Sequence, residues 1–522
     1  MSMQRLICPL AVLVLSLCGL AANAATFNVT RGDDPVPDGC LAADCSLREA
    51  IEATTATPEA DTIVLGAGQY QLTRGELAID GAISITGAGS AATRIVGQAS
   101  DVVLHAVPFG TLTVEGVEIA TTDGAAVIVE DNASATLRDI LVPSNTGGIG
   151  TATPNGDTGS GSLRVEHSTI GGEVACFQPQ GSCRIFDSRV HEMLVSDSAL
   201  ELVRVDLDGE NTDTYGLSIA GTGPVTIEDS TIRHTQTPLH LLADDDTAPT
   251  VHIRRTRFLD NTGPLYGERL SIVDMDEVEF RHHVISDDII GAPAVLFAQT
   301  GPTWFISKAL VVGNRGGNGL DGAVIRVVAG GRVAFDNSTF DDNTFRQDLG
   351  SGYGHTIGVY NDGSAQAILW LFHATMRRSI VLEDDTVGSL LTVRGIASDV
   401  RVDNSALRGT CGFGGGGAIA QAVGNAESVG DTCTFDPATN QIDVSSFDLS
   451  LGDLADNGGF TQTFYPSRVS ILLDAASEGF CMLFAPLDQR GYARPADGTA
   501  CDIGAVEVDA VSDSIFADDF DG

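Results

Sequence analysis

The sequence predicts an all-β fold: a parallel β-helix (solenoid) with a short amino-terminal capping helix and a disulfide-containing carboxyl-terminal region. Three observations lead to this prediction. A short apolar and polar template recurs along most of the chain, a helix-capping motif stands near the start, and cysteines fall in close pairs. Stacked repeats of this kind bury one continuous column of aliphatic side chains.

Residues 1–24 have the features of a secretory signal peptide. Arg5 supplies the positive charge, residues 6–20 form an apolar run, and Ala-Asn-Ala at 22–24 is a cleavage site. The apolar run is shorter than the roughly 20 residues that cross a bilayer. Cys18 follows Leu17 rather than a small residue, which argues against lipid attachment. We therefore expect an exported protein.

Residues 25–72 are expected to form the capping helix and the first coil. Ser-Leu-Arg-Glu at 46–49 is a capping box, in which the serine and glutamate side chains bond free amides of the first turn. Apolar residues at 47, 50 and 51 give this helix one apolar face. Two short apolar runs, 62–65 and 69–72, are separated by glycines and predict the first strands.

Residues 73–410 carry the repeating template and are expected to form the β-helix coils. Examples are Leu112-Val114-Gly116-Ile119, Val225-Ile227-Asp229-Ile232 and Val400-Val402-Asn404-Leu407. Alternation with period two predicts a strand with one buried face, and the polar position marks a bend into a second strand. A β-sandwich is the rival fold, because Asp80-Gly81 between two apolar runs is a hairpin signal. The template has no such link at its bend, which favours the coil.

The polar template position has two interpretations. It is a corner that favours residues able to bond their own backbone or reach solvent, or it is a stripe of ligand-binding groups. The mixed charges and residue types favour the structural corner. The residues expected to lie above one another there are Asp139, His167, Asp187, Asp229, Arg255, Glu277, Lys308, Asn337, His373 and Asn404.

Cysteines indicate disulfides. The chain has 10 cysteines, and removal of Cys8 and Cys18 with the signal leaves 10 − 2 = 8. An even number in an exported chain is typical of disulfide bonding, although eight cysteines allow 105 connectivities. Zinc is the weaker alternative, since no C-x-x-C pair is present. The neighbours in sequence are Cys40 and Cys45, Cys176 and Cys183, Cys411 and Cys433, and Cys481 and Cys501.

The formal net charge of −41 restricts the partners of the chain. Binding to nucleic acid requires a basic surface, so this class of function is excluded, and docking on anionic lipid is disfavoured. An acidic surface suits Ca²⁺, which is the one cofactor considered; a solvated acidic surface is the simpler explanation. No later segment is long and apolar enough to cross a membrane.

Several motifs resemble known families. Cys-Ser-Leu-Arg-Glu-Ala-Ile at 45–51, followed by 61–72, resembles the amino-terminal CSLREA domain of bacterial secreted β-helix proteins. Residues 258–261, 322–325 and 340–343 resemble the F-x-x-N and G-G-A-I repeats of polymorphic outer-membrane proteins, with Asp321 departing from the first glycine. The carboxyl region 411–508 is similar to the choice-of-anchor Q domain at 454–459, 461–463, 488–491, 494–495 and 501–507.

The resemblance implies a right-handed parallel β-helix at the surface of, or secreted from, a Gram-negative bacterium. Members of these families mostly have no known activity. The acidic tail 509–522 resembles the I-F-x-D-G-F-E endings of some exported proteins, with Asp519 in place of the usual glycine. A disordered acidic terminus is the alternative interpretation.

Enzymatic chemistry has weak candidates. A polygalacturonase-like order of motifs begins at 211–213, 244–245 and 354–355, but no R-x-K follows, because Lys308 is the only lysine. A lyase would need a Ca²⁺-binding carboxylate cluster beside a base. Residues 316–323 echo a single calcium nonapeptide, which a glycine-rich insertion explains better. The candidate catalytic residues are Asp341, Asp342, His355 and Arg377, with Arg346 and Arg378 nearby in sequence.

The function that these observations favour is non-enzymatic. We expect an exported β-helix protein that presents loops for adhesion or for binding a surface glycan or protein partner. The alternative is an extracellular polysaccharide lyase or hydrolase acting on an acidic glycan.

Overall fold

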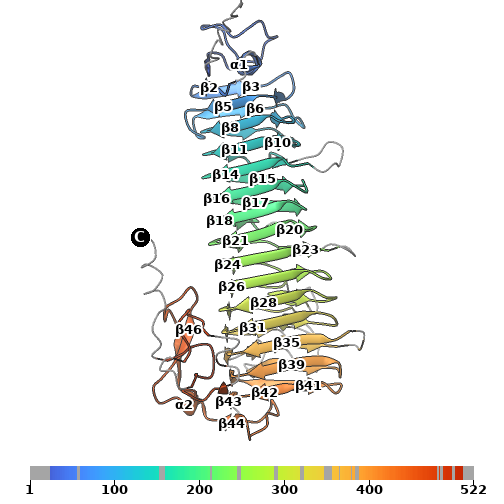
Figure 1. Cartoon of the computed structure of the whole chain (residues 1–522), viewed down its shortest axis with the longest axis vertical. Coiled ribbons are helices and arrows are strands. Elements are labelled where there is room, and N and C mark those ends of the chain that lie inside the picture. The colour runs from blue at the N-terminus through green and yellow to red at the C-terminus, as the bar shows by residue number, and fades with distance from the viewer. Residues whose placement is uncertain are drawn as a thin grey trace, which may run out of the picture.

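The computed structural model describes residues 24–508 except 56–58, 152–158, 212–213, 244–247, 287–291, 318–322, 346–354, 362, 364, 378, 382–386, 429, 479–480, 482–485 and 496–499. It is a long right-handed parallel β-helix, as predicted, in which 44 strands form one continuous sheet (Figure 1). The predicted signal peptide and acidic tail lie outside the described residues.

Each coil contributes one strand to each of three faces, which we name A, B and C in chain order. Face A contains β2 (Asp61–Leu65), β5 (Ala82–Thr86), β8 (Thr111–Glu115), β11 (Ser134–Arg138), β14 (Ser162–Glu166), β16 (Ser182–Phe186), β18 (Ala199–Val203), β21 (Pro224–Glu228), the first parts of β24 (Thr250–Leu259) and β26 (Ile272–Arg281), β28 (Thr303–Ser307), β31 (Arg332–Asp336), β35 (Ala367–Phe372), β39 (Ser398–Asp403) and β42 (Gln421–Val423).

Face B follows face A after one tight corner. It contains β3 (Gly68–Gln71), β6 (Thr93–Val96), β9 (Glu118–Ala120), β12 (Leu141–Val142), the first parts of β15 (Thr169–Cys176) and β17 (Arg189–Ser196), β19 (Asp206–Asp208), β22 (Thr231–Arg233), the second parts of β24 and β26, β29 (Leu310–Val312), β32 (Thr339–Asp341), β36 (Thr375–Arg377), β40 (Ala406–Arg408), β43 (Ala426–Ser428) and β44 (Gln441–Val444).

Face C completes each coil. It contains β4 (Leu77–Ile79), β7 (Leu104–Ala106), β10 (Ala125–Val129), β13 (Gly148–Thr151), the second parts of β15 and β17, β20 (Tyr215–Ala220), β23 (Thr237–Leu242), β25 (Leu265–Gly267), β27 (Leu296–Ala298), β30 (Ala323–Val327), β34 (His355–Tyr360), β38 (Val387–Arg394) and β41 (Thr410–Gly414). Two short strands, β33 (Asn343–Phe345) and β37 (Ser379–Val381), pair beside it.

The strand pairing rejects the sandwich alternative. The strands on either side of Asp80-Gly81 are β4 and β5; β4 pairs with β7, and β5 pairs with β2 and β8, all in parallel, so no hairpin forms there. Parallel pairing continues through β44, beyond the domain boundary that the sequence suggested at residues 410 and 411.

The core is a column of inward-facing side chains in exact register from coil to coil. Along face A each of them exposes 3% or less of its surface, and together they supply the continuous burial that holds the coils. Burying one aliphatic side chain stabilises the fold by roughly 1.5–3 kcal/mol. Consecutive members are Val114, Leu137, Val165, Ile185, Leu202, Ile227, Ile253, Met275, Ile306, Phe335, Leu371 and Val402.

The predicted polar column is the corner between faces A and B. All ten of its residues have a left-handed backbone, with φ between 45° and 58°. The predicted column omits one member: the coil near Asp187 is irregular, and Arg204, with φ 54°, takes the A-to-B position there, whereas Asp197 lies at a corner between faces C and A. The column is therefore a backbone corner, which explains its mixed side chains.

A serine ladder lies directly inside this corner. The residue after the left-handed position is buried, and where it is serine its hydroxyl donates to the carbonyl two residues earlier. The same hydroxyl accepts from an amide of the preceding coil, as Ser168 Oγ does from Ile140 N at 3.1 Å and Ser405 Oγ from Ala374 N at 3.0 Å. These serines therefore satisfy buried amides that the sheet leaves unpaired.

The F-x-x-N repeats form a second internal ladder where face B ends. Asn261, Asn314 and Asn343 are buried in one column, with His283 between the first two, and the amide groups of Asn314 and Asn343 donate to the carbonyls of Phe280 and Val311. Asn314 N in turn donates to Asn343 Oδ1 at 3.2 Å. The motif thus has a structural role in turning the chain.

The first coil is covered by the predicted helix. Helix α1 (Leu47–Thr54) begins with the capping box, in which Ser46 and Glu49 bond each other's backbone amides. Its apolar face is buried, and the short strand β1 (Thr26–Val29) pairs with β2 beneath it. Arg48 donates twice to Asp34, which fixes the helix to the preceding loop.

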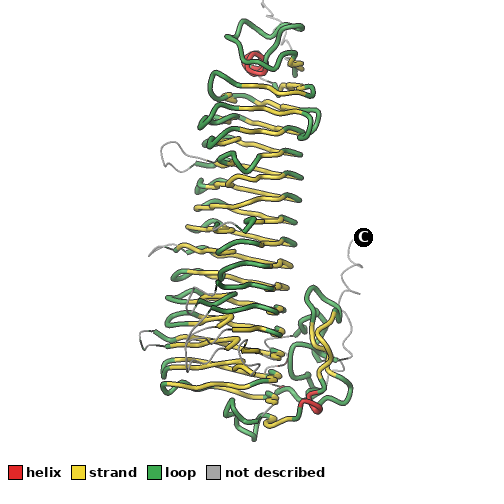
Figure 2. Tube along the Cα trace, turned by 180° about the vertical axis from the view of Figure 1, so that it is seen from behind, coloured by secondary structure: helices red, strands yellow, loops and turns green. Residues whose placement is uncertain are grey.

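The chain folds back after β44 into a carboxyl-terminal module, residues 445–508. It contains α2 (Ser446–Leu449) and an antiparallel pair, β45 (Leu451–Ala455) and β46 (Thr463–Pro466). Figures 1 and 2 show this module lying beside the last coils rather than beyond them. The four neighbouring cysteine pairs are all disulfides. In the described part of the chain, no helix has the length and apolar character needed to cross a membrane.

Candidate functional site

Two of the predicted catalytic residues meet on face B. Arg377 donates from two nitrogens to both carboxylate oxygens of Asp341, at 3.1 Å each. The ring of Phe464 from the module lies 4.1 Å from the Arg377 guanidinium, and the Asp341 side chain is only 9% exposed. The pair is therefore covered by the module and has the geometry of a structural ion pair.

The other two candidates lie apart from this pair. Asp342 is exposed at a left-handed turn position, whereas His355 is buried on face C and bonds the Tyr360 hydroxyl. Arg346, Arg378, residues 212–213 and 244–245, Gly354 and most of the nonapeptide-like stretch lie outside the described residues. Across the described ranges, no three His, Cys, Asp or Glu side chains gather as a metal-binding group would.

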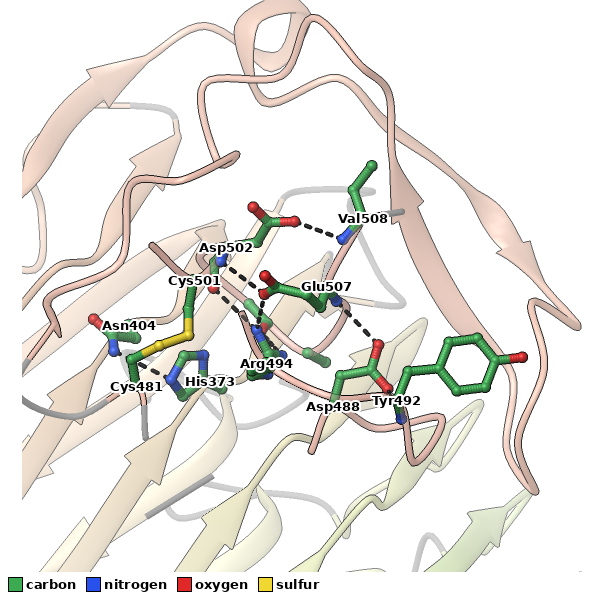
Figure 3. Close-up of polar contacts among 12 residues, drawn as sticks. His373, Asn404, Cys481, Asp488, Tyr492, Arg494, Cys501, Asp502, Glu507 and Val508 are labelled. Carbon is green, nitrogen blue, oxygen red and sulfur yellow. Dashed lines mark hydrogen bonds and ion pairs between the residues drawn. A yellow bond between two sulfur atoms is a disulfide. The ribbon is translucent and has the colours of Figure 1, made fainter. Parts of the chain in front are cut away.

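Charged residues of the carboxyl-terminal motifs, among them Arg494 and Glu507, form a buried cluster joined by hydrogen bonds (Figure 3). The Arg494 side chain is fully buried, and it donates to Glu507 Oε2 at 3.1 Å and to the Gly504 carbonyl at 2.7 Å. The Nη2 atom that bonds Gly504 also donates to Asn337 Oδ1 of the β-helix at 3.0 Å. One arginine thus joins the module to the corner column.

The surroundings of this arginine shift two neighbouring pKa values. Burial and the Arg494 charge hold the pKa of His373 well below its ordinary value, so the imidazole is neutral and lies 3.1 Å from Asn404 Nδ2. Burial raises the pKa of Asp336 to about 7, although the charge of Arg494 opposes the shift. These groups hold the module in place, and their pKa values are those of polar groups buried inside a folded protein.

The surface feature best suited to binding is an aromatic cleft on face A. Phe305, Ala334 and Trp370 occupy the same outward position on three consecutive coils, β28, β31 and β35. The small alanine leaves a cavity of about 160 Å³ between the two aromatic residues, with Ile368 and Arg332 also lining it. Phe305 is 47% exposed, so its ring is available to a ligand.

Two arginines lie near the aromatic cleft. Arg332 is exposed and lines the cavity, whereas Arg401 lies on the next coil, β39, with its guanidinium 5.0 Å from the Trp370 ring centre. Asp399 accepts from two nitrogens of Arg401 at 3.1 and 3.2 Å, which holds that side chain in position. The cleft therefore combines an apolar floor with cationic hydrogen-bond donors on a rigid sheet, an arrangement that binds a ligand with an apolar face and polar edges.

The sequence contained a signal for this cleft. The stretch Ala-Ile-Leu-Trp-Leu-Phe at 367–372 is apolar at every position, although a strand with one solvated face alternates. The inward set, Leu369 and Leu371, was identified, but the apolar outward set at 368, 370 and 372 was overlooked. Ala334, the residue that opens the cavity, gives no signal until the register is known.

The chain matches no protein-family model and no curated protein. Similar solved structures include the pectate lyase Pel9A, 12% identical over 93% of this chain and 97% of that one, with a TM-score of 0.26. Others are a mannuronic acid specific polysaccharide family 6 lyase from human gut microbiota (11% identical; 69% and 88% covered; TM-score 0.31) and the DFA-IIIase of Arthrobacter chlorophenolicus A6 (10%; 81% and 99%; 0.31). At such identities and scores the likeness concerns the fold alone.

Proposed function

We propose that this chain is an exported β-helix protein of a Gram-negative bacterium that binds a glycan through the aromatic cleft without cleaving it. The proposal includes the signal peptide, the CSLREA-type amino end and the choice-of-anchor Q-like carboxyl region expected from the sequence. The observation that supports binding is the outward pair Phe305 and Trp370, separated by Ala334.

The spacing of this pair suits one sugar ring. Neighbouring strands lie about 4.8 Å apart, so the two aromatic residues start about 9.5 Å apart on the sheet. Two van der Waals contacts of about 4 Å each fill most of that distance when a single ring is inserted. The C–H faces of a sugar would then contact Phe305 and Trp370, and its hydroxyl oxygens would accept from Arg332 and Arg401.

The rigid sheet favours binding by such a cleft. Both aromatic residues are held by parallel pairing on either side, so their backbone has little freedom left to lose when a ligand arrives. A preformed site therefore retains more of its contact energy as affinity.

The enzymatic alternative has one observation in its favour. Asp336 lies two residues from Ala334 on β31, and a pKa of about 7 suits a general acid or base. Its Oδ1 atom, however, is buried with no hydrogen-bond partner among the described residues, and its Oδ2 atom accepts from Asn337 at 3.0 Å. Asp336 is half-buried on the outward side of β31, and its partner Asn337 is bonded to Arg494 of the module, which supports a structural role, so we favour binding alone.

A glycan array with the mature protein, followed by titration of the best ligand, tests the proposal. We expect Trp370→Ala and Phe305→Ala each to weaken binding at least tenfold, because half of the stacking surface is removed. Phe447→Ala, which removes an 84% exposed ring on α2, is the matched control and should bind as wild type.

A reducing-end assay on the same glycans separates binding from catalysis. We expect every bound glycan to remain intact with the wild-type protein. Cleavage that Asp336→Asn abolishes would establish the enzymatic alternative, and the absence of binding to any glycan would overturn the proposal.

A further inference from the structure

We propose a second binding site, for a carboxylated sugar, in the groove between face B and the carboxyl-terminal module. The groove has a volume of about 470 Å³, within the range of small-molecule sites, and it lies where two parts of the chain meet. Arg257, Glu279 and Arg281 line it from the β-helix; Asp456, Phe460 and Gln462 line it from the module.

The β-helix side of the groove is a fixed cationic triad. Arg257 and Glu279 are direct neighbours on β24 and β26, and Arg257 Nε donates to Glu279 Oε2 at 3.1 Å. Arg281 donates to the other oxygen, Oε1, at 2.6 Å. Two guanidinium groups therefore share one carboxylate, which leaves a net charge of +1 on the β-helix side of the groove in a chain of −41.

The module side supplies an aromatic ring and polar groups of the opposite sign. The ring of Phe460 lies 4.4 Å from the Arg257 guanidinium, and Gln462 Oε1 accepts from Arg281 at 3.0 Å. Asp456 is exposed at the rim, with Oδ1 accepting from the amide of Gly458. The groove is consequently positive along the sheet and negative along the module.

This polarity selects the chemical class of the ligand. A carboxylate would bind the two arginines, since guanidinium groups recognise carboxylates through paired hydrogen bonds. Hydroxyl groups on the opposite edge would donate to Asp456 and bond the amide of Gln462, and an apolar C–H face would pack on Phe460. A sugar acid carries all three features on one ring, whereas a neutral sugar lacks the first.

The groove differs from the rest of the module contact. At two other places the contact is closely packed: Gln489 Oε1 accepts from Thr339, and the amide of Ala505 donates to Thr375, with all four residues buried. At Arg257 and Arg281 the module touches the sheet only through Phe460 and Gln462, and the groove remains open between these contacts.

Titration calorimetry with digalacturonic acid as the probe tests the site on the intact mature protein. We expect saturable binding that weakens as salt rises, and at least tenfold weaker binding with Arg257→Gln. Arg254→Gln, an exposed arginine on the same strand that points from face A, is the matched control and should bind as wild type. Thermal melting checks that each variant is folded.

Further variants and probes make the result decisive. Phe460→Ala keeps every charge and should weaken the binding of digalacturonic acid several-fold. The neutral disaccharide galactobiose should not bind this groove. Trp370→Ala should leave digalacturonic acid binding unchanged, so failure of the aromatic cleft and failure of this site are distinguishable. Equal binding of both disaccharides, or unchanged binding in Arg257→Gln, would overturn the inference.

Discussion

Face B has two regions built on the same backbone with different outer surfaces. On β19 and β22 the outward residues are polar or charged and mostly reach the surface, as in the ion pair between Arg233 and Asp206, whose side chains are 32% and 35% exposed. On β29 and β32 the equivalent column holds Leu310 and Thr339, both completely buried under the module. The inward residues, Ile232 and Val311, are alike.

This difference shows that coil formation and surface covering are separate properties of the sequence. The inward column and the left-handed corners build every coil in the same way, whatever lies outside. The outward residues alone decide whether a face remains in water or receives the module. The groove at Arg257 and Arg281 lies where the two regions of face B meet.

The largest expected effect comes from the covered region. Arg494→Met removes the arginine that crosses to Asn337 and leaves Glu507 buried without its partner. Breaking a buried pair costs about 3–5 kcal/mol, so we expect the module to open while the coils stay folded. Hydrogen exchange should rise across 445–508 and stay low in β8 to β22.

The matched control lies in the bare region. Arg233→Met breaks the exposed pair with Asp206 and a contact with buried Asp208, which Arg189 still bonds, so we expect the free energy of unfolding to change by less than about 1 kcal/mol. Similar decreases in the free energy of unfolding for Arg494→Met and Arg233→Met would contradict the division of face B into a covered and a bare region.

An intermediate effect should appear as a pH dependence. The pKa of Asp336 is raised to about 7 by burial, against about 3.9 in an unfolded chain. Between these two pH values the folded state binds more protons than the unfolded chain. The contribution of the protonated Asp336 side chain to the free energy of unfolding is therefore complete below about pH 4, and it is lost as the pH rises through 7. The loss is of the order of 2–4 kcal/mol.

Asp336→Asn isolates this contribution. It imitates the protonated side chain, so we expect higher stability than wild type at pH 8 and a flatter profile of stability between pH 4 and 8. Denaturant unfolding at several pH values measures both. A profile with an unchanged slope in the variant would show that Asp336 is not the titrating group.

The smallest expected effect compares two threonines of the same outward column. Thr375 Oγ1 accepts from the buried amide of Ala505 at 2.9 Å, whereas Thr231, on the bare region, is partly exposed. Thr375→Val keeps the shape but leaves that amide unsatisfied, which costs about 1–3 kcal/mol. Thr231→Val should change stability by less than about 0.5 kcal/mol. Chemical denaturation of both variants checks the difference.

The sequence allowed the coils to be predicted because period-two alternation and the corner residue are local signals. Ser46 and Glu49 likewise predicted the capping helix from four adjacent residues. The position of the module could not be predicted, because Leu310 and Thr375 are outward residues whose burial depends on a segment more than a hundred positions later in the chain. The same limit hid the aromatic cleft, which needs the register of three coils to bring Phe305, Ala334 and Trp370 together.

The irregular coil near Asp187 shows a further limit. Arg204 occupies the corner although arginine is an uncommon left-handed residue, and Asp197 resembles a corner residue but belongs to another turn. Residue type alone therefore did not distinguish the two turns, whereas the strand pairing of β16 with β18 does.

From β8 onward the A-to-B corner gives this protein one edge of constant length. Only two residues, such as Asp139 and Ile140, link the two faces there, whereas residues 87–92 link β5 to β6, and links between faces C and A extend from 197–198 to 152–161. One added residue at the A-to-B edge would exchange the inner and outer sides of the following strand. Foreign peptides inserted for display should therefore be tolerated along the other two edges, and the constant edge would keep them at a regular pitch.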